Sequence, residues 1–395
     1  MKPFLFLIRH FPPDVGALSF RMQHASEVLA REHPVCVLAA QPNRYRDVSS
    51  APRLEQRGRI KIHRVWHGQL LPGRGKISRG VTEIVGALWM TLVALLFYRR
   101  SAVVFVSTPP LFCAFPGWVV HKLCRVPLMV DLRDLWLDWA EEAGVIRSKM
   151  LLKLIGRYER SLLTSAKHIT VATKSFKEII SERFDIDPQR ITVIYNGLDE
   201  VLQRDEAADE SAPEKKNGVR RVLYAGNMGP SQSLLGIFDG CLDSVRKWPE
   251  LEIVLVGDGA QWAAMNARQT DRVRVVQRIG REELKALYQS ADAFLLHLAD
   301  LHVYQHTVPS KLFEYVSYQK PILCGVTGEA RGLCRQYVDC YEFLSDDPAS
   351  LGQAVDRFMQ GERPDNADSQ RSDLRTVLRS ARDSLWTQAF AAVGG

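Results

Sequence analysis

The stretch from residue 306 to residue 315 combines a helix start with a lysine and a carboxylate. Pro309 followed by Ser310 predicts that a helix begins here. Lys311 then falls in the first turn and Glu314 one turn later. Backbone N–H groups, the helix dipole and an ammonium group all attract an anion, so the stretch predicts a phosphate site in which Glu314 could hold a ribose. A capped surface helix without a ligand is the alternative.

Two carboxylates, Asp131 and Asp134, follow an apolar run at residues 128–130, and Arg133 lies between them in the sequence. A carboxylate at the end of a buried strand can accept a proton from an attacking hydroxyl group. We expect Asp134 to do so, with Asp131 as the competing candidate. Asp131 lies nearer the strand, where backbone N–H groups or Arg133 would bind it. A helix cap or a salt bridge with Arg133 is the alternative role for either acid.

Glycines follow three further apolar runs. Gly16 comes after the first run, shortly behind His10, while Gly226 and Gly257 follow two runs in the second half of the chain. A glycine where a strand turns into a helix lets backbone N–H groups approach an anion, although such a turn can also be ligand-free. No Gly-x-Gly-x-x-Gly pattern occurs here, so the chain lacks a dinucleotide fingerprint.

Short apolar, β-branched runs alternate with helical patterns and predict the elements that position these residues. The alternation predicts parallel sheets covered on both faces, and it occurs twice. The first set of runs lies at residues 4–8, 35–38, 60–65, 103–106, 128–130, 169–171 and 191–194. The second set lies at residues 222–224, 253–256, 273–276, 293–296 and 321–323.

Two domains follow from this pattern and from the length of 395 residues. We expect a first α/β domain at 1–198, a linker at 199–218 and a second α/β domain at 219–372. A terminal helix at 373–395 would cross back to the first domain. Two doubly wound, Rossmann-like sheets would place the carboxyl ends of their strands around one cleft, where ligands bind.

Positive charge gathers near an apolar stretch of the first domain. Residues 44–100 carry 12 Lys and Arg against 3 acids. Within them, Val81 to Tyr98 is almost wholly apolar, with Glu83 as the only charge. The apolar stretch is shorter than the roughly 20 residues that span a bilayer. Basic flanks around it favour a helix lying on an anionic membrane surface, with no role for nucleic acid. A helix packed fully against a sheet is the alternative.

The apolar run near the N-terminus and the cysteines indicate the cellular compartment of the protein. The run at residues 4–8 is shorter than the apolar region of a signal peptide. The seven cysteines form no Cys-x-x-Cys pair, which favours reduced thiols over disulfides or a zinc site. We therefore expect a cytoplasmic protein, held peripherally on the inner face of the plasma membrane.

Seven short motifs in the chain resemble the retaining GT-B glycosyltransferases of family 4, and within them bacterial cell-surface polysaccharide enzymes. Each motif is weak alone, but all seven occur in the family's order over nearly the whole chain. They are HFPPDVG at 10–16, STPPL at 107–111, DLRDLW at 131–136, IYNGLD at 194–199, YAGNMG at 224–229, VGDG at 256–259 and PSKLFEY at 309–315.

The resemblance implies a retaining hexosyl or N-acetylhexosaminyl transferase that needs no metal or other cofactor. Its donor would be a nucleotide sugar, UDP-linked by expectation, held mostly by the second domain. Its acceptor, lipid-linked or a polysaccharide precursor, would be held by the first. The acceptor side comprises His10, Thr108 and Arg133, beside the catalytic candidates. The donor side comprises Gly16, Gly226, Asn227, Gln232, Gly257, Arg278, His306, Ser310, Lys311, Leu312 and Glu314.

The chain departs from the family pattern at the donor phosphates. Glu314 matches the second glutamate of the family's Glu-x7-Glu motif, and His306 stands at the place of the first. The family's phosphate-binding Arg and Lys align with Asn227 and Gln232, so Lys311 is the expected substitute.

Two other functions are compatible with these features, one with the two-domain architecture and one with the missing cations. A UDP-sugar 2-epimerase has the same two domains but no acceptor. A non-catalytic sugar- or lipid-binding subunit would explain the missing cations. The Asp-x-Asp at 185–187 resembles the metal motif of another glycosyltransferase fold, but the proline that follows it predicts a turn.

Overall fold

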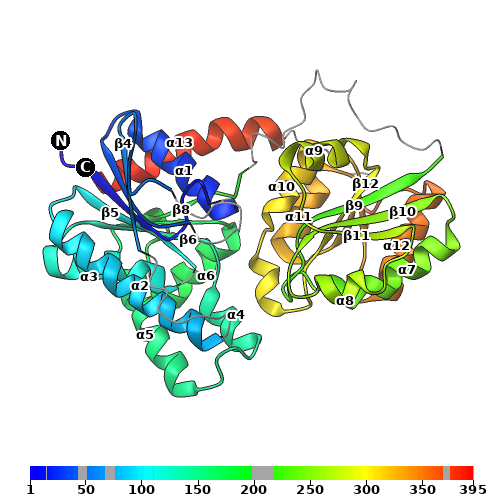
Figure 1. The fold of residues 1–395 in the computed structure, drawn as a ribbon, viewed down its shortest axis with the longest axis horizontal. Helices are drawn as coiled ribbons and strands as arrows, with labels where there is room; N and C mark the ends of the chain where they lie inside the picture. Colours follow the sequence, from blue (N-terminus) through cyan, green and yellow to red (C-terminus); the bar gives the residue numbers. More distant parts are fainter. Residues whose placement is uncertain are drawn as a thin grey trace. The chain divides into compact units, whose positions relative to one another are not determined.

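The computed structural model describes residues 1–14, 16–42, 51–66, 76–109, 111–197, 218–367 and 374–394. The chain divides into two compact units, one formed by Met1–Tyr195 with Leu378–Gly395 and the other by Asn196–Val377. Each unit is built around one twisted sheet with helices packed on it (Figure 1). Parts of the predicted basic segment (44–50 and 67–75) and of the predicted linker (199–217) lie outside the described residues.

The first unit contains an eight-stranded sheet in the order β3-β4-β2-β1-β5-β6-β7-β8. All neighbours are parallel except β3 and β4. The strands are β1 (Phe4–Ile8), β2 (Val35–Ala40), β3 (Leu54–Arg57), β4 (Ile60–Val65), β5 (Val103–Thr108), β6 (Leu128–Leu132), β7 (His168–Val171) and β8 (Ile191–Val193).

Helices cover both faces of this sheet, as the continuous apolar runs require. Phe6 and Phe105 belong to the core cluster that contains Trp386, whereas Leu7 and Val106 lie against Gly117 on the other face. The helices are α1 (Ala17–Ala30), α2 (Lys76–Phe97), η1 (Leu111–Ala114), α3 (Phe115–Cys124), α4 (Trp136–Glu142), α5 (Lys149–Ser165), α6 (Lys174–Phe184) and η2 (Pro188–Arg190).

The second unit contains a six-stranded parallel sheet in the order β11-β10-β9-β12-β13-β14. Its strands are β9 (Arg220–Asn227), β10 (Leu251–Asp258), β11 (Val273–Val276), β12 (Ala293–His297), β13 (Ile322–Gly325) and β14 (Cys340–Glu342). Its helices are η5 (Leu234–Ile237), α7 (Phe238–Lys247), α8 (Trp262–Asn266), α9 (Arg281–Ser290), η6 (His302–His306), α10 (Ser310–Ser317), α11 (Gly328–Tyr337) and α12 (Pro348–Gln360). The two parallel sheets confirm the predicted fold class.

The terminal helix α13 (Leu374–Gly394) packs on the first unit, which confirms the predicted crossing. Trp386 and Phe390 are buried in the core cluster of the first sheet. Asp383 pairs at 3.0 Å with His24 and at 2.7 Å with Arg31, both on α1. Two polar pairs at the surface thus fix a helix whose apolar face completes the first core.

Two strands are missing from the sequence prediction. The edge strand β3 carries the polar sequence LEQR and pairs antiparallel with β4, so no apolar run marks it. β14 is only three residues long. The predicted turn at 185–187 is present, because Asp185 ends α6 in the left-handed conformation at φ 56° and the Asp187 carboxylate accepts from the N–H of Gln189 at 2.8 Å.

Candidate active site

The acceptor-side residues lie at one edge of the first sheet. His10 follows β1, Thr108 ends β5, and Arg133 and Asp134 follow β6, and these three strands are neighbours in the order β1-β5-β6. Arg133 is fixed there by its backbone N–H to Thr108 O (2.9 Å) and its guanidinium to Pro109 O (2.6 Å). The carboxyl ends of parallel strands thus gather the predicted residues of this unit at one place.

Asp131 is fully buried and committed to other side chains of its own unit. Arg21 on α1 donates to it at 2.7 and 3.2 Å. The hydroxyl groups of Ser107 (2.9 Å) and Thr170 (2.8 Å) donate to it as well. Burial alone would raise the pKa of Asp131, but the charge and hydrogen bonds of Arg21 hold it below its usual value. Backbone N–H groups or Arg133 were the expected partners. The observed hydrogen-bond donors are these side chains, while Arg133 acts on Asp131 through its charge.

Asp134 is only partly buried and differs from Asp131 in its surroundings. No residue within the described ranges donates a hydrogen bond to its carboxylate, and Arg133 is the charged neighbour that acts on it. Burial raises the pKa of Asp134 to about 6, against the opposing effect of Arg133. A carboxylate with a pKa near neutrality and without a fixed donor suits proton transfer better than one locked in an ion pair.

His10 makes a contact that the sequence analysis missed. Its Nδ1 lies 2.9 Å from the Asp14 carboxylate, four residues later, and Asp14 is buried. A carboxylate that holds one ring nitrogen fixes the tautomer and the orientation of the imidazole ring. The i, i+4 spacing of a histidine and an aspartate was the available signal. Thr108 also offers a buried hydroxyl oxygen that has no hydrogen-bond partner among the described residues.

In the second unit, Lys311 lies directly over Gly226. A Cβ atom on Gly226, which has φ +151°, would stand 1.6 Å from Cε of Lys311 and 2.3 Å from its Nζ. The ammonium group lies 5.0 Å from the centroid of the Tyr224 ring. Burial lowers the pKa of Lys311 to about 8, and Glu314 opposes this effect. The start of α10 therefore carries its lysine to the glycine near the end of β9, which is the arrangement that the predicted phosphate site requires.

The residues at the two missing cation positions bond to each other. Asn227 donates its side-chain amide to Oε1 of Gln232 at 2.7 Å. Next to this loop, Gly257 lies against Gly226, since a Cβ on Gly257 would stand 1.7 Å from Gly226 O. Gly257 therefore allows two neighbouring strand ends to pack closely.

Glu314 is held from within its own unit. The buried Tyr288 hydroxyl donates to its Oε2 at 2.7 Å. The backbone N–H of Ala225 donates to the Tyr315 hydroxyl at 3.0 Å, which ties α10 to β9. None of the seven motifs contains Tyr288, so no signal in the sequence indicated that it orients Glu314.

The other donor candidates are spread more widely. Ser310 begins α10, while the side chain of Leu312 is fully buried, so only its backbone could face a ligand. His306 ends η6, and the exposed Arg278 follows β11, the edge strand two places from β9. Gly16 precedes α1 in the first unit with φ 152°. No group of three metal-ligating side chains was found in the ranges that the structure describes.

Sequence models of two protein families match the chain one after the other. Residues 16–197 match the family described as a glycosyl transferase 4-like domain. Residues 219–361 match glycosyl transferases group 1. No protein with a curated description matches the chain.

Solved structures share the whole architecture at low sequence identity. HepE of Anabaena, solved in complex with UDP and glucose, is 14% identical with a TM-score of 0.65, covering 98% of this chain and 99% of its own. Sucrose-phosphate synthase of Thermosynechococcus elongatus is 15% identical with a TM-score of 0.65, covering 100% and 96%. The UDP-forming α,α-trehalose-phosphate synthase of Burkholderia vietnamiensis is 13% identical with a TM-score of 0.66, covering 99% and 96%.

At these identities the solved structures establish the fold, and the two family matches establish the kind of protein. Together the matches extend over most of both units. They contain five of the seven motifs whole, with Gly16 alone from the first motif and residues 194–197 from the fourth. The chain belongs to the family 4 glycosyltransferases, retaining sugar-transfer enzymes with the GT-B fold.

Proposed function

We propose that this protein transfers a sugar from a UDP-linked donor, with retention, to a lipid-linked or polysaccharide-precursor acceptor at the cytoplasmic face of the plasma membrane. The observation that carries the donor half is the placement of Lys311 over Gly226, at the start of a helix. Support for UDP comes from HepE, which was solved with UDP, and from the UDP-forming trehalose-phosphate synthase.

The leaving group of such a transfer is a nucleoside diphosphate, whose negative charge grows as the sugar departs. Lys311 and the N–H groups at the start of α10 would stabilise that charge, and no metal ion is part of the proposal. Glu314, oriented by Tyr288, would accept hydrogen bonds from the ribose hydroxyls. Asp134 would orient and deprotonate the acceptor hydroxyl in the first unit.

Replacing Lys311 by alanine is expected to weaken UDP binding about 10- to 100-fold, because a hydrogen bond to a charged group contributes about 1.5–3 kcal/mol. In the wild-type protein, UDP affinity should fall as the pH rises through about 8, where burial places the pKa of Lys311. Isothermal titration calorimetry between pH 6.5 and 9.5 measures both effects. The Lys311→Ala variant should lose this pH dependence.

Lys247 provides the matched control, since its ammonium also lies over an aromatic ring, at 5.9 Å from Trp248, but on α7. Lys247→Ala should bind UDP like the wild type. Unchanged UDP affinity in Lys311→Ala would refute the phosphate role. Conversion of the UDP-sugar to an epimer without any acceptor would refute sugar transfer in favour of epimerisation.

The membrane half of the proposal is supported by the outward face of α2. None of the described helices meets the length and hydropathy needed to cross a bilayer. Ile84, Leu88, Leu92 and Leu96 recur every four residues along α2 and are between 46% and 63% exposed. Arg99 and Arg100, both exposed, follow the helix. An apolar helix face beside arginines is the pattern of an interfacial helix, and a helix packed fully against the sheet would have buried it.

Replacing Leu88, Leu92 and Leu96 by serine should abolish binding to vesicles of phosphatidylglycerol and phosphatidylcholine. The wild type should bind them at low salt and lose binding as salt rises, because charges are screened beyond about 10 Å at 0.1 M. Vesicle sedimentation measures this, with neutral vesicles for comparison. Leu344→Ser, at a 64% exposed leucine of the second unit, is the control and should bind normally. A wild-type protein that ignores anionic vesicles at low salt contradicts the proposal.

A further inference from the structure

The first half of α5 exposes an apolar surface that no part of the candidate active site uses. Met150 is 83% exposed, Leu154 62% and Leu151 43%. Leu154 follows the other two positions by four and three residues, so the side chains form one stripe along the helix, which we call the α5 stripe. The inner side of the helix is buried, for example at Ile155. The α5 stripe is therefore the outer face of a helix that packs on its inner face.

Basic residues run beside the α5 stripe. Lys149, Lys153 and Arg157 recur every four residues along the helix, and Arg147 precedes it. All four are exposed, and none of them pairs with an acid in the part of the chain that the structure describes. The sequence holds no Asp or Glu from 143 to 158. These cations attract an anionic partner, and the adjoining apolar stripe requires a partner that also offers apolar surface.

Helix α5 lies on the same face of the first sheet as α2 (Figure 1). Connections between parallel strands are right-handed, so connections that cross a sheet in one direction lie on one face. α2 leads from β4 to β5, α3 from β5 to β6, and α5 from β6 to β7, all in the same direction across the sheet. In agreement, α3 packs on α2, and the ring centroid of its Trp118 lies 5.6 Å from that of Tyr158 on α5. The outer sides of α2 and α5 therefore face away from the same side of the sheet.

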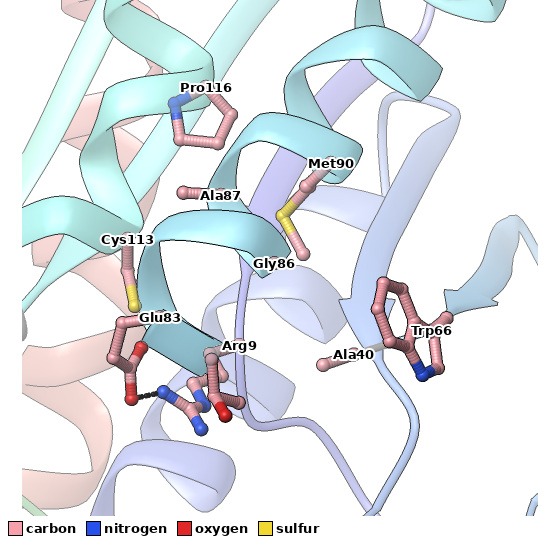
Figure 2. A pocket seen from close by; sticks show the side chains of 10 residues that line it. Arg9, Ala40, Trp66, Glu83, Gly86, Ala87, Met90, Cys113 and Pro116 are labelled. Carbon is pink, nitrogen blue, oxygen red and sulfur yellow. Dashed lines mark ion pairs between the residues drawn. The ribbon is translucent and has the colours of Figure 1, made fainter. Parts of the chain in front are cut away.

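The inner side of α2 is fixed within the unit (Figure 2). Glu83 forms an ion pair with Arg9, which directly follows β1. Met90, two turns later on the same side of the helix, is buried. Leu88 and Leu92 lie on the other side and are exposed. The ion pair and the buried methionine thus determine which side of α2 faces outward.

We propose that the α5 stripe and its basic residues bind an anionic bilayer surface as a second contact, separate from α2. The inference rests on the proposed membrane contact of α2 and adds to it the surface that recognises headgroup charge. Exposed apolar side chains fit the boundary of the acyl chains, and Lys and Arg beside them fit anionic headgroups. Between residues 81 and 98 of α2 the sequence holds no Lys or Arg. The two helices thus divide the contact, because α2 supplies the larger apolar face and α5 supplies cations.

A second contact fixes the orientation of the first unit. A protein held by one helix alone can still turn about the axis of that helix, and a second helix removes this freedom. α4 packs on α5 and begins two residues after Asp134. The α5 contact therefore sets where the proposed base stands relative to the bilayer. The second contact also forms intramolecularly, at a high effective concentration, so the loss of either contact should weaken binding strongly.

Neutralising the basic residues tests the contact through charge. The variant Lys149→Gln, Lys153→Gln, Arg157→Gln should bind vesicles of phosphatidylglycerol and phosphatidylcholine about 100-fold more weakly at low salt, because each cation near such a surface contributes about fivefold in affinity. Vesicle sedimentation measures the partition coefficient. UDP affinity should stay unchanged, since Lys311 and Glu314 belong to the other unit.

The matched control removes the same formal charge from exposed residues of the second unit, in the variant Arg246→Gln, Lys247→Gln, Arg268→Gln. It should bind the vesicles like the wild type. An equal loss in both variants would overturn the proposal, because binding would then respond to net charge alone. Normal binding by the α5 variant would overturn it as well.

A fluorescent label tests whether the α5 stripe itself meets lipid. Bimane is attached at Met150→Cys in a protein whose partly exposed cysteines, Cys36, Cys113 and Cys124, are replaced by serine. Its emission should shift to the blue with anionic vesicles and be quenched by lipids that carry bromine in their acyl chains. A label at Glu27→Cys, exposed on α1, should show neither effect, because α1 crosses the sheet in the opposite direction. No shift at Met150→Cys, or the same shift without vesicles at rising protein concentration, would overturn the proposal, the latter in favour of a second copy of this chain.

These outcomes separate the inference from the proposed function. Vesicle binding that depends on Leu88, Leu92 and Leu96 but not on the α5 residues would refute the second contact alone. A wild-type protein that ignores anionic vesicles would refute the membrane half of the proposed function together with this inference. UDP binding tests the donor half independently of both.

Discussion

Replacing Asp134 by asparagine is expected to lower kcat by about 10²-fold or more, the usual contribution of general base catalysis, while UDP affinity stays unchanged. The substitution keeps the shape of the side chain and removes its charge. Apart from Gly16, the donor candidates lie on the other unit, so UDP binding should not respond. Initial rates with a UDP-sugar and membrane extract, together with calorimetric UDP binding, measure both quantities.

The pH dependence of the wild type provides an independent test of the same residue. Because burial raises the pKa of Asp134 to about 6, its carboxylate is protonated below that pH and cannot accept a proton. We expect kcat/KM to fall tenfold per pH unit below about 6, and this acidic limb should disappear from the residual activity of Asp134→Asn.

Asp138 is the matched control. It lies on the neighbouring helix α4 and forms an ion pair with Arg183 at 2.8 Å. Asp138→Asn should retain wild-type turnover and the acidic limb. Near-normal turnover in Asp134→Asn would contradict the assignment. A dead His10→Asn variant in the same assay would then transfer the role to the His10–Asp14 pair.

Replacing Arg21 by alanine is expected to cost about 3–5 kcal/mol of unfolding free energy, because it leaves the buried Asp131 charge without its partner. Arg21 also donates to the carbonyl of Ile194 at 2.6 Å and lies 5.1 Å from the centroid of the Trp386 ring, so the loss reaches β8 and α13. Urea denaturation of the wild type, of Arg21→Ala and of a control variant, Arg31→Ala, measures the change in unfolding free energy. Arg31→Ala, at a 62% exposed partner of Asp383, should cost under about 1 kcal/mol.

The pH dependence of the unfolding free energy should reverse in Arg21→Ala. In the wild type Arg21 depresses the pKa of Asp131, so the stability from the pair is present above the carboxyl's ordinary pKa and is lost as the pH falls through its folded value. Without Arg21, burial raises that pKa, so acid should reduce the deficit. A double variant, Arg21→Met with Asp131→Asn, should recover part of the lost stability. A deficit that does not vary with pH would contradict the ion-pair explanation.

All described strands except β3 and β14 could be predicted, because each is a short apolar run and the runs repeat in the order of a doubly wound fold. The edge strand β3 could not, because its sequence is polar and only its pairing with β4 makes it a strand. Whether the outward face of α2 is covered or exposed could not be predicted either, because an apolar helix has the same sequence pattern in both cases.

The sequence could group candidate residues that are close in the chain, such as Lys311 and Glu314, and their roles stay predictions. The site could not be predicted where distant residues meet. Arg21 is 110 positions from Asp131, and Tyr288 is 26 positions from Glu314. No spacing rule links such pairs, because the fold alone brings them into contact. The need for glycine at position 226 could not be predicted for the same reason. Lys311, which fills the space that a side chain at position 226 would take, comes much later in the chain.

The placement of α13 separates the order of synthesis from the order of folding. The first sheet is made first, but the helix that covers Phe6 and Phe105 follows the entire second unit in the chain. A nascent chain emerges from its N-terminus, and domains generally fold as units when they are complete. The second unit can therefore become native on the ribosome while the first still exposes an aromatic surface. A chaperone that acts during translation would find its binding site on the older half of the molecule.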